Sequence, residues 1–185
     1  MAERFVLRRG PASSNTLAVR QLPSATRYVL RGAPEAFESA VPALGLAFAP
    51  RACRAVSDGK RSALWLGPDE LLLLAPEAEQ SECSAALTAA LGTHAHSLVD
   101  VSHRQCSIEL MGASVESILR TGCPLDLHIS AFPVGMCTRT VYAKTEIVLW
   151  RQSLQAFQVE VWRSYTEYLT ALLAQATQEY PSIAH

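Results

Sequence analysis

The sequence predicts an α+β fold built from two similar halves. Short segments of alternating apolar and polar residues predict strands, whereas apolar residues at a spacing of three or four predict helices. The order strand, helix, several antiparallel strands, helix occurs twice along the chain. The helices do not alternate regularly with single strands, as they would around a parallel doubly wound sheet. We therefore expect an extended N-terminal arm over residues 1–24 and a single domain over residues 25–180, with halves at about 25–92 and 93–180.

The N-terminal arm and the first elements follow from local signals. Pro11 and Pro23 would interrupt any helix in the arm. Residues 26–31 alternate in the manner of a strand, and Pro34 suits the first turn of a helix that ends at Gly45. The rest of the first half is predicted as strands over 52–56, 63–66 and 71–74 and an alanine-rich helix over 77–91.

The second half repeats this order. We expect strands over 96–101 and 104–110, a helix over 114–120, an irregular segment over 124–136, strands over 138–143, 146–151 and 157–162, and a closing helix over 164–178. In the last strand Phe157, Val159 and Val161 share one face. Gln158, Glu160 and Trp162 lie on the other. In the closing helix, Tyr165, Tyr168, Leu169, Leu172, Leu173 and Ala176 occur at helical spacing.

Composition restricts the class of protein. Charged residues make up 18% of the 185 residues, against about 25% in an average soluble domain, which favours contacts with other subunits. The net charge of −1 and the lack of a basic cluster argue against nucleic-acid binding. Five cysteines without a C-x-x-C pair indicate reduced thiols in the cytoplasm. We expect no membrane association, because no signal sequence and no apolar run of about 20 residues occurs.

Familiar catalytic patterns are weak in this chain. His94 and His96 lack the further ligands that zinc requires. Asp100, Ser102 and His103 have the residue types of a hydrolase triad, but they are nearly adjacent and no G-x-S-x-G elbow accompanies them. Glycine-rich nucleotide-binding motifs do not occur. A thiol-dependent enzyme remains an alternative, with Cys106, Cys123 and Cys137 as candidate nucleophiles. We predict no catalytic, cofactor-binding or metal-binding residue in this chain.

Large planar side chains concentrate toward the C-terminal half. Tryptophan and arginine are the residues that most often anchor protein–protein interfaces. A tryptophan on the outer face of a strand, as predicted for Trp162, would be exposed to water unless another surface packs against it. We therefore predict that a subunit interface is formed by His103, Arg104, Arg139, Trp150, Arg151, Trp162 and Arg163.

Several motifs, in order, resemble the gamma-subunit family of heterotetrameric bacterial sarcosine oxidases, from about residue 26 to about residue 175. They are Leu64-Trp65-Leu66-Gly67-Pro68-Asp69-Glu70, Val99-Asp100-Val101-Ser102-His103-Arg104, Gly122-Cys123-Pro124-Leu125-Asp126-Leu127, Phe132-Pro133-Val134-Gly135, Cys137-Thr138-Arg139-Thr140 and Val161-Trp162-Arg163-Ser164.

This resemblance implies a structural, non-catalytic subunit of an oxidoreductase complex. Such a complex demethylates sarcosine oxidatively to glycine, with formation of hydrogen peroxide and methylene-tetrahydrofolate. The resemblance also implies partners, the alpha, beta and delta subunits, with alpha as the main contact. FAD, FMN, NAD, tetrahydrofolate and zinc are then expected in those partners and not in this chain.

The Asp100-Val101-Ser102-His103 strand, followed by Met111-Gly112-Ala113-Ser114, also resembles the folate-binding aminomethyltransferase (glycine-cleavage T-protein) superfamily. This likeness implies an α+β fold like the N-terminal part of a T-protein. It leaves an alternative function open, a free-standing folate-binding protein of the aminomethyltransferase type. In that alternative Glu146 is the acidic residue in the region where the T-protein carries its folate-side acids.

Overall fold

A computed structural model describes residues 17–47 and 51–179. The described chain divides into two units, one within residues 24–103 and one of residues 17–23 together with 104–179. Each unit has its own antiparallel five-stranded sheet and its own helices, so the α+β class is confirmed. No helix within the described ranges is long and apolar enough to cross a membrane.

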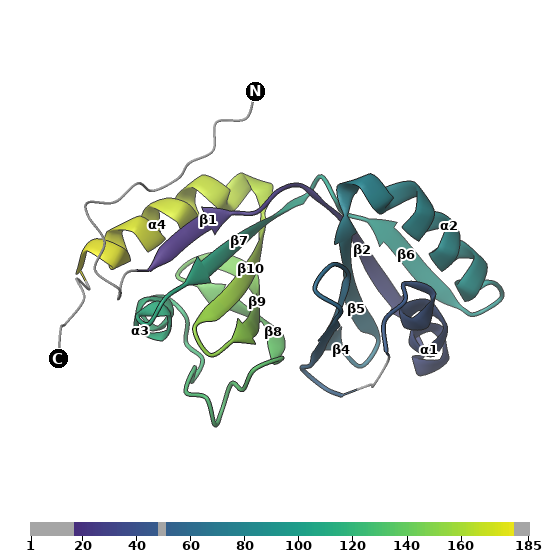
Figure 1. The fold of residues 1–185 in the computed structure, drawn as a ribbon, viewed down its shortest axis with the longest axis horizontal. Coiled ribbons are helices and arrows are strands. Elements are labelled where there is room, and N and C mark those ends of the chain that lie inside the picture. Colours follow the sequence, from purple (N-terminus) through teal and green to yellow (C-terminus); the bar gives the residue numbers. More distant parts are fainter. Residues whose placement is uncertain (1–16, 48–50, 180–185) are drawn as a thin grey trace. The chain divides into compact units, whose positions relative to one another are not determined.

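The 24–103 unit is a sheet with two helices on one face (Figure 1). Its strand order is β3-β4-β5-β2-β6. The elements are β2 (Ala25–Gly32), α1 (Pro34–Ala43), β3 (Ala55–Ser57), β4 (Ser62–Gly67), β5 (Glu70–Pro76), the 3-10 turn η1 (Glu77–Glu79), α2 (Gln80–Leu91) and β6 (His96–Asp100). The apolar sides of β2 and β5, with Leu30, Leu71 and Leu73, pack against Phe37 of α1 and Leu87 of α2. The apolar residues at every second position of the strands and those at helical spacing in α1 and α2 thus form one core.

The other unit repeats the plan with strand order β1-β7-β10-β9-β8. Its elements are β1 (Ala18–Gln21), β7 (Gln105–Met111), α3 (Val115–Arg120), β8 (Cys137–Tyr142), β9 (Thr145–Ser153), β10 (Ala156–Trp162), the 3-10 turn η2 (Arg163–Tyr165) and α4 (Thr166–Glu179). Phe157, Val159 and Val161 face the core, as the alternation predicts.

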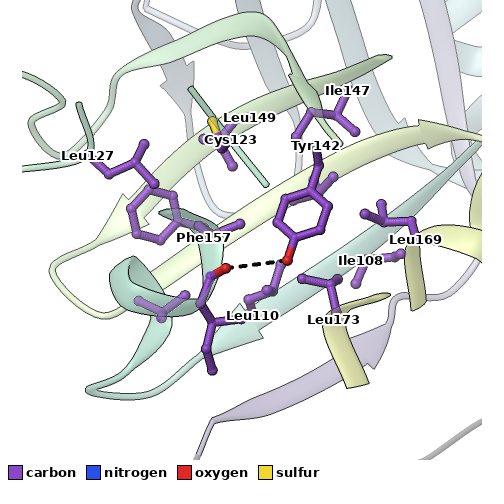
Figure 2. Close-up of a cluster of buried hydrophobic side chains, with 14 of the residues drawn as sticks. Ile108, Leu110, Cys123, Leu127, Tyr142, Ile147, Leu149, Phe157, Leu169 and Leu173 are labelled. Carbon is purple, nitrogen blue, oxygen red and sulfur yellow. Dashed lines mark hydrogen bonds between the residues drawn. The ribbon is translucent and has the colours of Figure 1, made fainter. Parts of the chain in front are cut away.

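Tyr142 is the polar member of that core (Figure 2). Its ring lies among Ile108, Leu169 and Leu173, and its hydroxyl donates to the carbonyl of Ile118 over 3.3 Å. A hydroxyl buried this deeply needs such a partner, because an unpaired polar group in an apolar surrounding is costly. The contact ties β8 to α3.

Three expectations about organisation differ from the structure. The described part of the predicted arm includes β1, which pairs antiparallel with β7; residues 1–16 lie outside the described ranges. Residues 96–100, expected to open the second half, form β6 and pair with β2 of the first sheet. The units therefore divide after residue 103 and not after residue 92. Residues 52–53 form a turn before β3, in which Cys53 has a φ of 57°.

Candidate interaction surface

Four of the seven residues predicted for the interface lie on exposed positions around the start of β7 and the end of β10. Arg104 and Trp162 are both exposed, and the Arg104 guanidinium lies 5.1 Å from the centre of the Trp162 ring. The N–H of Arg163 donates to the carbonyl of Arg104 over 2.8 Å, which joins the two segments through the backbone. His103 is exposed and precedes Arg104 in the chain. The structure thus brings Arg104, Trp162 and Arg163 together.

The same region carries two exposed tyrosines that the prediction did not include. Trp162, Tyr165 and Tyr168 are 41%, 44% and 39% exposed. Tyr165 ends the 3-10 turn η2 and Tyr168 lies in the first turn of α4, three residues later. Their helical spacing groups them with the core residues Leu169 and Leu173, but the core begins only at Leu169. We call Arg104, Trp162, Arg163, Tyr165 and Tyr168 the arginine–aromatic cluster.

Arg151 does not belong to any exposed surface. Its side chain is 1% exposed, and its guanidinium donates to the carbonyls of Leu127 over 3.0 Å and Phe132 over 2.8 Å. It also pairs with Glu116 and lies 4.8 Å from the ring centre of Phe157. The interface prediction is wrong for this residue, because its own chain uses the donors that a partner would need.

Trp150 is also buried, with 8% of its surface exposed, so it does not lie on the exposed surface that the prediction described. It stands opposite Cys137 on the sheet face away from the α3–α4 core. Within the described part of the chain its indole N–H has no hydrogen-bond partner. Arg139 is exposed on β8, and its guanidinium lies 3.7 Å from the carboxylate of Glu146. Arg139 therefore lies on a different strand from the arginine–aromatic cluster, at the β8 edge of the same sheet.

The sheet face that carries Trp150 holds a buried polar row. Glu160, 2% exposed, accepts hydrogen bonds from the Ser107 hydroxyl and, over 2.8 Å, from the Gln158 amide. Gln152 in turn donates to Gln158 over 2.8 Å. Sequence alternation correctly placed Gln158 and Glu160 opposite the core, but it did not predict that they are buried. The row is internally satisfied, as buried polar side chains must be.

Asp100, Ser102 and His103 do not form a catalytic triad. The Ser102 hydroxyl donates to Asp100 over 2.6 Å and accepts the backbone N–H of Arg27 over 2.9 Å. A nucleophilic serine would instead give its proton to a histidine. Partial burial alone would raise the pKa of Asp100, but hydrogen bonds from the hydroxyl and N–H of Ser102 and from the Gln80 amide lower it overall. Asp100 therefore acts as a charged cap of the turn that follows β6.

The candidate metal ligands contact neighbouring residues of the chain, and the candidate thiol nucleophiles are buried or half-buried. The His94 ring contacts the Ser39 hydroxyl at 3.1 Å, and His96 contacts the carbonyl of His94 at 2.8 Å. Across residues 17–47 and 51–179, no three His, Cys, Asp or Glu side chains are grouped as a metal ion needs, so these residues do not fit a zinc site. Cys123 and Cys137 are buried, whereas Cys106 is half-buried. Burial raises the pKa of Cys83, which disfavours its thiolate.

Comparison with known proteins gives a consistent result. The model of the sarcosine oxidase gamma subunit family matches residues 31–179. Sarcosine oxidase subunit gamma of Corynebacterium sp. strain P-1 is 33% identical, over 92% of this chain and 85% of that protein. The Arthrobacter sp. subunit gamma is 31% identical, over 98% of this chain and 96% of that protein.

Solved structures agree with these relatives. Heterotetrameric sarcosine oxidase from Corynebacterium sp. U-96, in complex with pyrrole 2-carboxylate, contains a chain that matches with a TM-score of 0.85 and 29% identity, over 94% of this chain and 89% of that one. The aminomethyltransferase T of Bartonella henselae matches with a TM-score of 0.65 and 10% identity, over 86% of this chain and 46% of that one. The second likeness is one of fold, and it confirms the expected resemblance to part of a T-protein.

Proposed function

The chain belongs to the sarcosine oxidase gamma subunit family, and we propose that it acts as a structural, non-catalytic subunit of a heterotetrameric sarcosine oxidase. The observation that carries this proposal is the match over nearly the whole chain to relatives named as the gamma subunit, together with the likeness in fold to a chain of a heterotetrameric sarcosine oxidase. The enzyme would demethylate sarcosine oxidatively to glycine, forming hydrogen peroxide and methylene-tetrahydrofolate. It would do so in the cytoplasm.

The cofactors of the reaction, FAD, FMN, NAD, tetrahydrofolate and zinc, would be held by the companion subunits. In this chain the candidate catalytic serine and the candidate folate-side carboxylate are bonded to residues of the chain itself. Ser102 is bonded to Asp100 and to the backbone of Arg27, and the Glu146 carboxylate on the β8–β9 hairpin pairs with Arg139. These contacts support a structural role for both groups.

The contribution of this chain would be made through contacts with the other subunits, with alpha as the main partner. The arginine–aromatic cluster is the surface best suited to this role. Its tyrosines and tryptophan offer large rigid areas with little entropy to lose, and Arg104 already stacks on Trp162. His103, next to Arg104, would extend the contact. Arg139, on β8, would make a separate one.

Purification of the tagged chain, produced together with its companion subunits, tests the proposal. A yellow complex containing three other polypeptides is expected, with the flavin absorbance eluting together with this chain. A colourless single chain that binds tetrahydrofolate would overturn the proposal in favour of the aminomethyltransferase-like alternative. In that case Glu146→Gln should weaken folate binding, whereas in a structural subunit it should leave the flavin content and the assembly unchanged.

A further inference from the structure

Strand β6 lies at one edge of the sheet in the 24–103 unit. In the order β3-β4-β5-β2-β6 it has one neighbour, β2, among the described strands. Its side chains are exposed except that of Leu98, which is half-buried against the core, and Val99 retains 50% of its accessible surface. The opposite edge, β3, is only three residues long. β6 is therefore the longer free edge of this sheet.

The backbone of β6 offers its unused groups in a regular row. The N–H of Val101 donates to the carbonyl of Arg27 over 2.8 Å, and β2 and β6 then pair antiparallel without a register shift. Because antiparallel strands alternate between residues that face the partner and residues that face away, Ser97 and Val99 bond to β2. The N–H and C=O groups of His96, Leu98 and Asp100 point away from the sheet.

This edge lacks the usual features that prevent further pairing. Natural edge strands are commonly blunted by proline, lysine or a bulge. The central residues Ser97, Leu98 and Val99 carry no charge, and no bulge interrupts β6. A free edge of this kind is a template for another strand.

A groove runs beside the edge, between β6 and α2. It encloses about 730 Å³ and is lined by alternate residues of β6 (His96, Leu98 and Asp100) and by Gln80, Ser81, Ser84, Ala85 and Thr88 of α2, with Tyr28 beneath. Its side-chain oxygens are hydroxyls, the Gln80 amide and the Asp100 carboxylate. Asp100 is the only carboxylate in the lining, and the lining contains no lysine or arginine. Oδ1 of Asp100 accepts two hydrogen bonds from Ser102 and its Oδ2 one from Gln80, so the hydrogen bonds to its negative charge come from neutral donors. The groove therefore suits side chains that are apolar over Leu98 and positively charged next to Asp100.

We infer that β6 accepts an extended segment of a companion subunit as a sixth strand of this sheet, with a lysine or arginine of that segment facing Asp100. The backbone of the added segment bonds to His96, Leu98 and Asp100, and its alternate side chains enter the groove beside α2. A second copy of this chain fits less well, because symmetric pairing about Leu98 would place His96 opposite Asp100, and histidine carries no permanent charge at neutral pH. The inference rests on the proposed function, since it needs companion subunits.

Residue-resolved hydrogen exchange on the purified complex tests this pairing, with β6 as its own reference. Ser97 and Val99 bond to β2 in any case and should exchange slowly. If a strand is added, the amides of His96, Leu98 and Asp100 should also be protected, by about 100-fold or more over the unpaired rate. Slow exchange only at Ser97 and Val99 would overturn the inference while leaving the subunit function intact. A chain that purifies without companions would overturn both.

The charge contact has a separate test. Asp100→Asn should increase exchange at His96 and Leu98 in the complex at least several-fold, because the cationic side chain loses its counter-charge, and it should leave Ser97 and Val99 protected by β2. Because Asp100 also accepts hydrogen bonds from Ser102 and Gln80, faster exchange at all four amides would show loss of the turn and not of the charge contact. Glu77→Gln, which removes an exposed carboxylate outside the groove, is the matched control and should have no effect. Equal behaviour of the two variants would contradict a cationic partner segment. A chain that dimerises alone and protects the same three amides would assign the edge to a second copy.

Discussion

The guanidinium of Arg151 donates to the backbone carbonyl of Phe132 over 2.8 Å inside the hydrophobic core. The same side chain bonds to the carbonyls of Leu127 and Leu154 and pairs with Glu116. One buried cation therefore holds the irregular segment between α3 and β8 against strand β9 and helix α3. A segment with no helix or strand of its own needs such a partner for its carbonyl groups.

Replacing Arg151 by methionine should destabilise the protein by about 3 kcal/mol, because several buried acceptors and Glu116 lose their donor at once. Chemical denaturation of the full chain measures the change. The matched control is Arg120→Met, since the half-exposed Arg120 lies 3.6 Å from the same Glu116. Exposed pairs contribute less than about 1 kcal/mol. Equal effects of the two variants would show that Arg151 does not organise the segment.

Truncating Trp162 should weaken assembly without unfolding the chain. Trp162→Ala removes an exposed ring next to Arg104, and an anchor of this type contributes about 1–3 kcal/mol, or roughly 5- to 150-fold in affinity. The fraction of chain recovered with companion subunits measures this. Leu154, 66% exposed in the turn between β9 and β10, provides the control Leu154→Ala. Loss of assembly in both variants, or in neither, would remove the arginine–aromatic cluster from the interface.

Gly122 is required by the close approach of Tyr142. A Cβ atom at Gly122 would lie 2.9 Å from the Tyr142 ring, which is fixed in the core by its bond to Ile118. We expect Gly122→Ala to cost about 1–3 kcal/mol in stability, as overpacking usually does. Gly67→Ala serves as the control, since its added Cβ meets its nearest neighbour at 3.5 Å, an ordinary contact. Unchanged stability of Gly122→Ala would mean that the ring can move aside.

The Asp100 carboxylate should make folding stability depend on acid pH. Its pKa is lower in the folded chain, because the hydrogen bonds from Ser102 and Gln80 outweigh the opposing effect of burial. A group with a lowered folded pKa stabilises the fold above its unfolded value, about 3.9 for aspartate, and this contribution is lost as the pH falls through the folded pKa.

Titration of the Asp100 carboxyl carbon by NMR in the wild type and in Ser102→Ala checks this. The variant loses the hydroxyl donor, so the pKa of Asp100 should rise toward the ordinary value, and the acid-side loss of stability attributable to this group should shrink. Asp58 is an internal reference, since its pKa is lowered by backbone N–H groups of Arg61 and Lys60 that the variant leaves in place. A pKa of Asp100 that is unchanged in Ser102→Ala would show that the hydroxyl is not the source.

Local pattern predicted most elements and their inward faces. Alternation placed Phe157, Val159 and Val161 in the core, because side chains of a strand point to opposite sides in turn. The surface was harder to predict. Trp150 and Arg151 have the residue types of an interface, yet both are buried, since a chain can supply enough carbonyls and aromatic rings to cover an arginine. Tyr165 and Tyr168 continue the helical spacing of the core but extend beyond its end.

The sequence by itself determined the α+β class, the repeated order of elements and the family, because all three depend on local periodicity and on motifs read in order. Tertiary structure alone decided which sheet each strand joins. β1, which the sequence assigned to the N-terminal arm, pairs with β7 in the sheet of the second unit. β6, which the sequence assigned to the second half, pairs with β2 and forms an edge of the sheet of the first unit. Strand pairing is made by hydrogen bonds between segments far apart in the chain. The alternation of apolar and polar residues in one strand does not show which other strand it pairs with.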